Sequence, residues 1–112
     1  MNQNSRTARR IVRERAAATR LARSLRRGRS LKTHALAAGI APETADGVAN
    51  GLRSVAKRLG VQPVKVARTH RGAERLRKSY RYTPAQVAVL RAAYRPRKTE
   101  YRAAVERMAL AA

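Results

Sequence analysis

The clearest hydrophobic pattern in the chain lies between residues 42 and 59. Apolar positions there step by three and four residues, which is the spacing of one face of an α-helix: Ala45, Val48, Leu52, Val55 and Leu59. Pro42 suits the first helical position, and Glu43 in the first turn complements the helix dipole. Gly60 suits the C-cap. The pattern therefore predicts a helix over residues 42–59 with one face in the core.

A second amphipathic pattern covers residues 6–27, and Gly28 ends it. On a helix its apolar positions gather on one side: Ile11, Ala18, Leu21, Ala22 and Leu25. The opposite side carries seven arginines and no acid: Arg6, Arg9, Arg10, Arg13, Arg20, Arg23 and Arg27. We expect the apolar side to pack on the core and the arginine side to contact phosphates. A solvated face and a helix lying on a membrane surface are the alternatives, and an apolar side without Trp or Phe would anchor poorly.

Between these two segments the pattern predicts a short helix over residues 31–38, with Ser30 as N-cap and Gly39 as its end. Residues 61–82 are ambiguous. The valines there are compatible with a short extended wing near residues 61–70, and Pro63 is equally compatible with the start of a helix. Farther on, Thr83 and Gln86 have the spacing of a capping box, which predicts a helix that ends before Pro96. A last helix is expected over about residues 98–110.

The charge of the chain indicates the kind of partner that this helical protein binds. The 112 residues include 27 Lys and Arg but only 6 Asp and Glu, a formal net charge of +21. The net charge is +9 over residues 1–29, +2 over residues 30–63 and +10 over residues 64–112. A compact domain of such charge repels itself unless a polyanion is present, so we expect nucleic acid as the partner.

The segment around Gly39 has the residue types of a tight corner between two helices. Ala35 is small enough for a close crossing, Gly39 tolerates a positive φ, and Ile40 can plug the crossing together with Ala45 and Val48. The stretch ALAAGIAPETADGVAN at residues 35–50 resembles the helix-turn-helix of lactose-repressor-type regulators, in which a small residue precedes Ala-Gly-aliphatic and a Thr-led second helix ends in Val-x-Asn. The resemblance covers about residues 31–50.

That resemblance implies a second helix whose exposed residues face base edges in the major groove: Pro42, Glu43, Thr44, Asp46, Gly47 and Asn50. Two departures weaken the match. The second helix continues to about residue 59, and its opening carries carboxylates, which can accept from cytosine but repel phosphates. Thr44 and Asn50 are therefore the stronger candidates for base contacts.

Basic residues on both sides of this corner are candidates for phosphate contacts. Besides the arginine side of residues 6–27, they are Arg53, Lys57, Arg58, Arg68, Arg71, Arg75, Arg77, Lys78 and Arg81, with His70 in the same cluster. Tyr80 and Tyr82 could stack on exposed bases, and the ordinary alternative is that they cap a small core.

Catalytic chemistry finds no support in the sequence. The chain has no cysteine, and His34 and His70 lack a neighbouring acid–thiol or metal-ligand arrangement. There is no phosphate-binding glycine loop and no paired carboxylates for a two-metal site. We expect a protein without enzymatic activity, metal or cofactor.

The sequence as a whole predicts an all-α fold, a small helical bundle containing a helix-turn-helix. Its segments are a basic amphipathic helix at residues 1–29, a helix-turn-helix core at 30–60 and a basic C-terminal helical region at 61–112. The C-terminal pair also offers apolar surface for a homodimer: Tyr94, Tyr101, Val105 and Met108.

The expected function is sequence-specific or architectural binding of double-stranded DNA, as in bacterial, phage or plasmid transcription regulators. An RNA-binding or ribosome-associated protein is one alternative, and an accessory factor that holds a recombinase or replication enzyme on DNA is another. The absence of an apolar leader or of an apolar stretch near 18 residues predicts a cytoplasmic protein of the bacterial nucleoid without a membrane partner. The arginine-rich start also fits a mitochondrial transit peptide.

Overall fold

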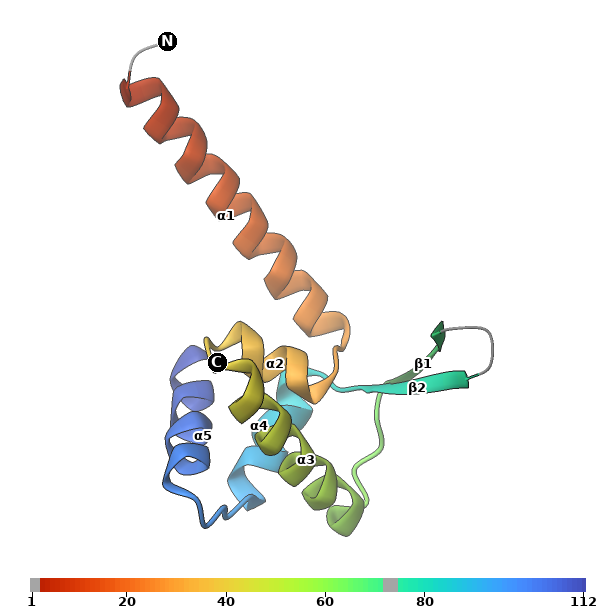
Figure 1. Ribbon diagram of the computed structural model, residues 1–112. Coiled ribbons are helices and arrows are strands. Elements are labelled where there is room, and N and C mark those ends of the chain that lie inside the picture. The colour runs from red at the N-terminus through yellow and green to blue at the C-terminus, as the bar shows by residue number, and fades with distance from the viewer. Residues whose placement is uncertain (1–2, 72–74) are drawn as a thin grey trace.

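The computed structural model describes residues 3–71 and 75–112, and the side chains of residues 69–77 lie outside that description. Most described residues are helical, which confirms the all-α expectation, and one two-stranded antiparallel sheet is added. In chain order the elements are α1 Gln3–Arg27, α2 Leu31–Ala37, α3 Pro42–Leu59, β1 Lys65–Arg71, β2 Arg75–Arg81, α4 Pro84–Ala93 and α5 Thr99–Ala111. Figure 1 shows α2 to α5 gathered in one body, from which α1 and the hairpin project.

The core of that body lies around α3, which contacts α2, α4 and α5. Four large side chains from these helices are fully buried: Leu31, Val48, Leu52 and Leu90. Burying one such side chain contributes roughly 1.5–3 kcal/mol, so burial of these four contributes on the order of 10 kcal/mol to folding. The predicted core stripe of α3 is confirmed at Ala45, Val48, Leu52 and Val55. It is wrong at Leu59, which stays 48% exposed in the last turn, while Val61 packs against the core after Gly60 reverses the chain.

The corner between α2 and α3 has the predicted capping and turn chemistry. The Ser30 hydroxyl accepts a hydrogen bond from the backbone N–H of Thr33 at 3.2 Å, as an N-cap does. Gly39 has φ of 86°, a conformation that a Cβ would strain. The N–H of Ile40 then reaches back to the carbonyl of Ala35 at 3.3 Å, and Ala35 is fully buried at the crossing. The two helices are thereby held close by a short turn.

The segment that the sequence left ambiguous holds the two antiparallel strands β1 and β2, here called the hairpin, and not the alternative helix starting at Pro63. The strands extend beyond the wing expected near residues 61–70, as far as Arg81, and their antiparallel register pairs Lys65 with Arg81. The hairpin is anchored at its root by two backbone hydrogen bonds between Arg29 and Tyr82, at 3.1 and 2.8 Å. Tyr82 is only 5% exposed there, so of the two tyrosines considered for base stacking this one caps the core.

His34 fastens the hairpin root to α2. Its Nε2 lies 2.7 Å from the carbonyl oxygen of Tyr82, a geometry in which Nε2–H donates to that oxygen. The ring is buried, and burial lowers the pKa of His34 because a charged imidazolium would lose its hydration. The hydrogen bond to the Tyr82 carbonyl raises the pKa and the positive charge of Arg29 lowers it, and the pKa of His34 is lowered overall. A neutral histidine therefore joins α2 to the hairpin.

Helix α4 is capped as predicted, and both C-terminal helices pack within the chain. The Thr83 hydroxyl accepts from the Gln86 N–H at 3.3 Å, while the Gln86 side-chain oxygen accepts from the Thr83 N–H at 3.0 Å. Met108 of α5 is buried in the core, and Tyr94 and Tyr101 are half-buried against α3. Much of the apolar surface proposed for a homodimer is thus already covered inside one chain.

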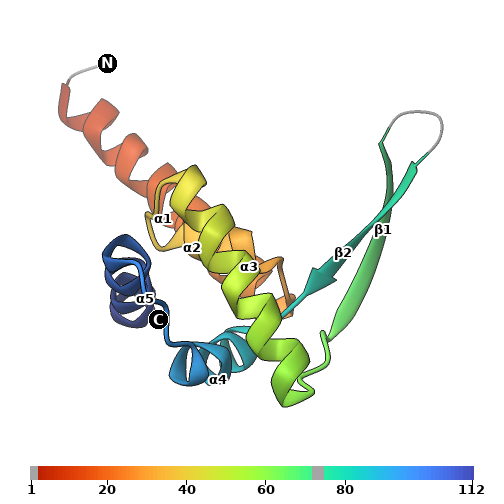
Figure 2. The same ribbon diagram turned by 60° about the horizontal axis from the view of Figure 1, so that its bottom comes forward.

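Helix α1 does not pack on the core, which corrects the expectation for its apolar side. None of its residues is buried, and Ile11 and Leu21 are 40% and 43% exposed. Figures 1 and 2 both show α1 leaving the body at its C-terminal end only. Two features explain this. Gly28, with φ of 108°, redirects the chain between α1 and α2, and the apolar side of α1 is rich in alanine, which gains little from burial.

Candidate nucleic-acid interface

The solvent-facing side of α3 is a single stripe that changes sign along the helix. Its exposed members follow a helical spacing: Glu43, Asp46, Asn50, Arg53 and Lys57. The first half carries two carboxylates and the second half two cations. We call these five residues the α3 stripe. A polyanion is repelled by the first half of the stripe and attracted by the second.

Two members of the α3 stripe are held by contacts inside the protein. The Asp46 carboxylate pairs with the Lys32 ammonium of α2 at 2.9 Å, and the Asn50 side-chain oxygen accepts from Arg53 at 2.6 Å. Both pairs are at the surface, where such contacts stabilise by no more than about 1 kcal/mol. Asp46 and Asn50 are therefore oriented by neighbours but remain accessible.

Of the other residues expected to contact bases, Pro42 and Glu43 are exposed, Thr44 is half-buried, and Gly47 lies off the α3 stripe. A Cβ built on Gly47 would overlap the Tyr101 ring of α5, with Tyr101 Cε1 at 2.9 Å. Gly47 thus faces α5 and not a groove of DNA. The helix-turn-helix resemblance placed it wrongly because such a unit, taken alone, has no later helix to cover that side.

Gly51 has the same role on the next turn of α3, and no sequence pattern predicted it. A Cβ built there would lie 2.6 Å from Cε1 of Tyr94. The two glycines, spaced by four, form a smooth strip on which two tyrosine rings rest, and burial raises the pKa of Tyr94. The signal that could have revealed this is the i, i+4 pair of glycines inside an otherwise strong helix, where glycine costs about 1 kcal/mol against alanine.

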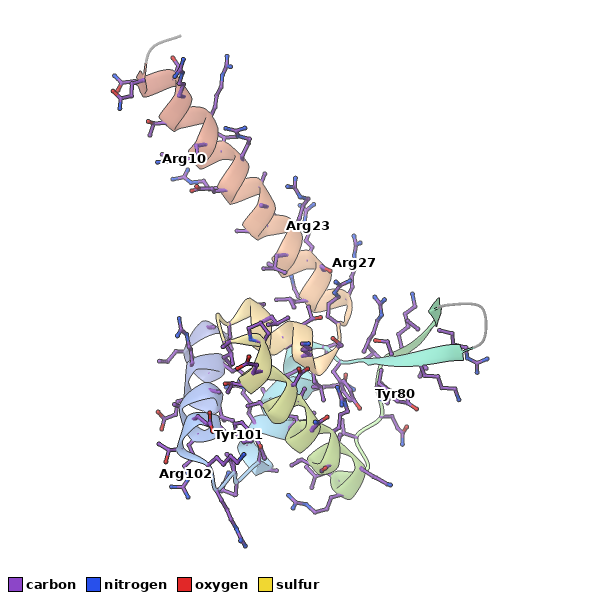
Figure 3. The ribbon with its side chains drawn as sticks, viewed as in Figure 1. Arg10, Arg23, Arg27, Tyr80, Tyr101 and Arg102 are labelled. Carbon is purple, nitrogen blue, oxygen red and sulfur yellow. The ribbon has the colours of Figure 1, made fainter. Side chains whose placement is uncertain are left out.

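The arginine side of α1 is confirmed as a continuous exposed surface. All seven arginines of that side are exposed, and the one acid of α1, Glu14, approaches Arg10 at 3.9 Å. Like charges three and four residues apart weaken an isolated helix by a few tenths of a kcal/mol per pair. Figure 3 shows Arg10, Arg23 and Arg27 extending from α1 into open space. Nothing in the described part of the protein neutralises the rest of this side.

The hairpin places like charges opposite one another. Its register pairs Lys65 with Arg81, and Arg68 with Lys78. Directly opposed like charges destabilise a strand pair, so the pairing is unfavourable unless an anion lies against it. Lys65 was not among the predicted phosphate contacts, because its place opposite Arg81 becomes visible only once the register is known.

Three further predicted phosphate contacts, Arg71, Arg75 and Arg77, belong to the strands, and their side chains lie outside the described residues, as does that of His70. Tyr80 is 45% exposed on the hairpin.

The remaining predicted cations lie at the end of α3. Arg53 and Lys57 are exposed on the α3 stripe. The Arg58 guanidinium donates to the carbonyl oxygen of Ala93 at 3.3 Å, which ties α3 to the end of α4. Arg58 therefore has a structural partner, as Arg53 has in Asn50, and neither Arg53 nor Lys57 forms an ion pair with a described side chain.

Comparison with known protein families, with curated proteins and with solved structures gave no match. Across residues 3–71 and 75–112, none of the helices combines the length and apolarity that a membrane crossing requires. Among the described side chains, histidines and acids do not gather in groups of three or more that could ligate a metal.

Proposed function

We propose that this protein binds double-stranded DNA, chiefly through its phosphates, as a regulator or architectural factor. The observation that carries the proposal is the exposed arginine side of α1 together with the like-charge pairs of the hairpin. Each is an energetic cost to the free protein that a polyphosphate relieves. The α2–α3 corner with a hairpin beside it adds a shape suited to a duplex, because an exposed helix can enter the major groove.

Sequence recognition, in this proposal, belongs to the α3 stripe. Asn50 is its best candidate for a base contact, since an amide can bond two edge atoms of adenine. Thr44 and Glu43 lie at the start of the same helix, where recognition helices approach bases. Arg53 and Lys57 then hold the flanking backbone. Selection of bound fragments from random duplexes tests this idea: an enriched motif supports reading by α3, and its absence leaves an architectural role.

The central experiment is a binding titration on a random duplex of about 20 base pairs over a series of salt concentrations. With six to ten phosphate contacts, affinity should fall by roughly 10³–10⁵ between 50 and 200 mM salt. Weak binding that hardly varies with salt would contradict the proposal. A structured RNA of equal length, measured at matched salt, is the comparison that assigns the nucleic acid.

RNA is the second candidate, and one observation favours it. Tyr80 stands partly exposed beside Lys78 on the hairpin, an arrangement that stacks unpaired bases in single-strand and RNA-binding proteins. If RNA is the partner, Tyr80→Leu lowers RNA affinity while leaving binding to duplex DNA unchanged. An accessory factor for a recombinase or replication enzyme would instead bind duplex weakly alone and more tightly when its partner enzyme is added.

A further inference from the structure

Helix α1 and the hairpin leave the body at one point and diverge from it, as both ribbon views show (Figures 1 and 2). The junction is tight. A Cβ on Gly28, at the end of α1, would lie 2.8 Å from Cγ2 of Val64 and 3.5 Å from Cβ of Arg81. The backbone bonds between Arg29 and Tyr82 fix the same junction from the other side. The two arms are therefore anchored together, although neither covers the other.

The cations of the two arms face the space between them. In a strand pair, residues opposite each other share a face, so Lys65 and Arg81 lie on one face of the hairpin. The Cβ of Arg81 lies beside Gly28, which places that face toward α1. In Figure 3, Arg23 and Arg27 project from the side of α1 that lies toward the hairpin. We call these four residues, with Arg20 one turn earlier on α1, the arm corner.

No described acid neutralises the arm corner. Glu14 sits near the apolar side of α1, toward Arg10, and the other described acids belong to α3 and α5. Among the side chains that the structure describes, none places an opposite charge against the five cations of the arm corner, in contrast to the α3 stripe, where two carboxylates come first. A phosphate chain gains more from the arm corner than from the start of α3.

We propose that the arm corner is a binding site of its own for the backbone of duplex DNA, with α1 and the hairpin holding one duplex between them. The inference rests on the proposed DNA-binding function and names the surface that supplies most of the affinity. At about 1.5 Å per residue, the 25 residues of α1 span roughly 37 Å, the length of about 11 base pairs. The arm is therefore long enough to follow the duplex for a full turn.

Tethered cleavage tests the geometry, and the chain suits it because it has no cysteine. Single cysteines carrying an iron chelate are introduced as Ala16→Cys on the arginine side of α1 and as Ser79→Cys on the hairpin face of Arg81. Ala103→Cys, exposed on α5, is the control. We expect an end-labelled duplex of about 30 base pairs, roughly three turns, to be cut from both arm positions and not from the control. Cutting from the hairpin alone, or equally from all three positions, would overturn the clamp.

Matched charge variants test the energetics. One carries Gln at Arg20, Arg23 and Arg27, and the other carries Gln at residues 97, 98 and 102, near the α4–α5 junction and away from the arms, so both have the same net charge. Losing three phosphate contacts lowers the slope of log affinity against log salt by about 2.7, whereas the control variant keeps the wild-type slope. Circular dichroism checks that α1 stays helical.

The outcomes separate this inference from the function on which it rests. If the wild-type protein ignores duplex DNA, the proposed function fails and the inference fails with it. If the wild-type protein binds and the two variants weaken equally, only the arm corner is refuted. If a duplex RNA of the same length binds more tightly than DNA at matched salt, the assignment to DNA is overturned.

Discussion

Replacing Gly47 by alanine tests whether Gly47 packs against the Tyr101 ring or faces DNA, as the helix-turn-helix resemblance implies. In an open helix position the change stabilises by about 1 kcal/mol, because glycine loses more backbone entropy. Here the added methyl group would stand 2.9 Å from Cε1 of Tyr101 and closer still to the phenol end of that ring. Overpacking of this kind costs roughly 1–3 kcal/mol, so after that gain is subtracted we expect a net destabilisation of about 1 kcal/mol, and at most about 2 kcal/mol.

Thermal and urea unfolding measure this directly, with a fall in Tm of about 4 °C per kcal/mol. The matched control is the same substitution in a Tyr101→Leu background, where the obstructing ring is gone. There Gly47→Ala should become neutral or stabilising, giving a coupling energy of roughly 2 kcal/mol in the double-mutant cycle. Unchanged or raised stability in the wild-type background, together with altered duplex affinity, would refute the packing and restore Gly47 to the DNA-facing side.

Three other predictions concern the stability of the fold. Because the folded-state pKa of His34 is lowered, the stability contributed by the neutral ring is complete above about pH 6.5 and is lost as the pH falls through the folded-state pKa. Urea unfolding should therefore show a lower free energy of unfolding at about pH 5 than at about pH 7. In the His34→Gln variant this difference between the two pH values should be smaller. Thr83→Ala removes the bond that the Thr83 hydroxyl accepts from the Gln86 N–H and should cost about 1 kcal/mol by the same assay, whereas an effect near zero would mean that the cap is not formed in solution. Gly28→Ala places a methyl group 2.8 Å from Val64 at a residue whose φ is 108°, and it should cost about 2–4 kcal/mol of stability. Gly60→Ala is the control, because it meets only the strain of a φ of 72° and should cost about 1 kcal/mol. Equal losses of stability in the two variants would contradict the tight junction at Gly28.

Predictions from the sequence were right where the cause was local. Ser30, Pro42, Gly60 and Thr83 act within one turn of their own helix, so the caps and the helix boundaries could be derived from neighbouring residues. The hairpin was only half predicted. Its valines fit a short strand, but its length and register depend on which residue of the second strand meets which of the first, and that is set by the anchoring of Tyr82 in the core.

The helices of this protein, most of their caps and the positive charge of its surface could be predicted from the amino-acid sequence. Hydrophobic periodicity, capping residues and charge are properties of short stretches of the chain. Three features emerged only from the folded chain: α1 has no buried residue, Tyr101 rests on Gly47, and the hairpin strand with Arg81 starts beside the end of α1 at Gly28. These are contacts, or missing contacts, between residues far apart in the chain. Which of these contacts form depends on which side chains from different elements pack into the core, and the sequence of one segment does not contain that information.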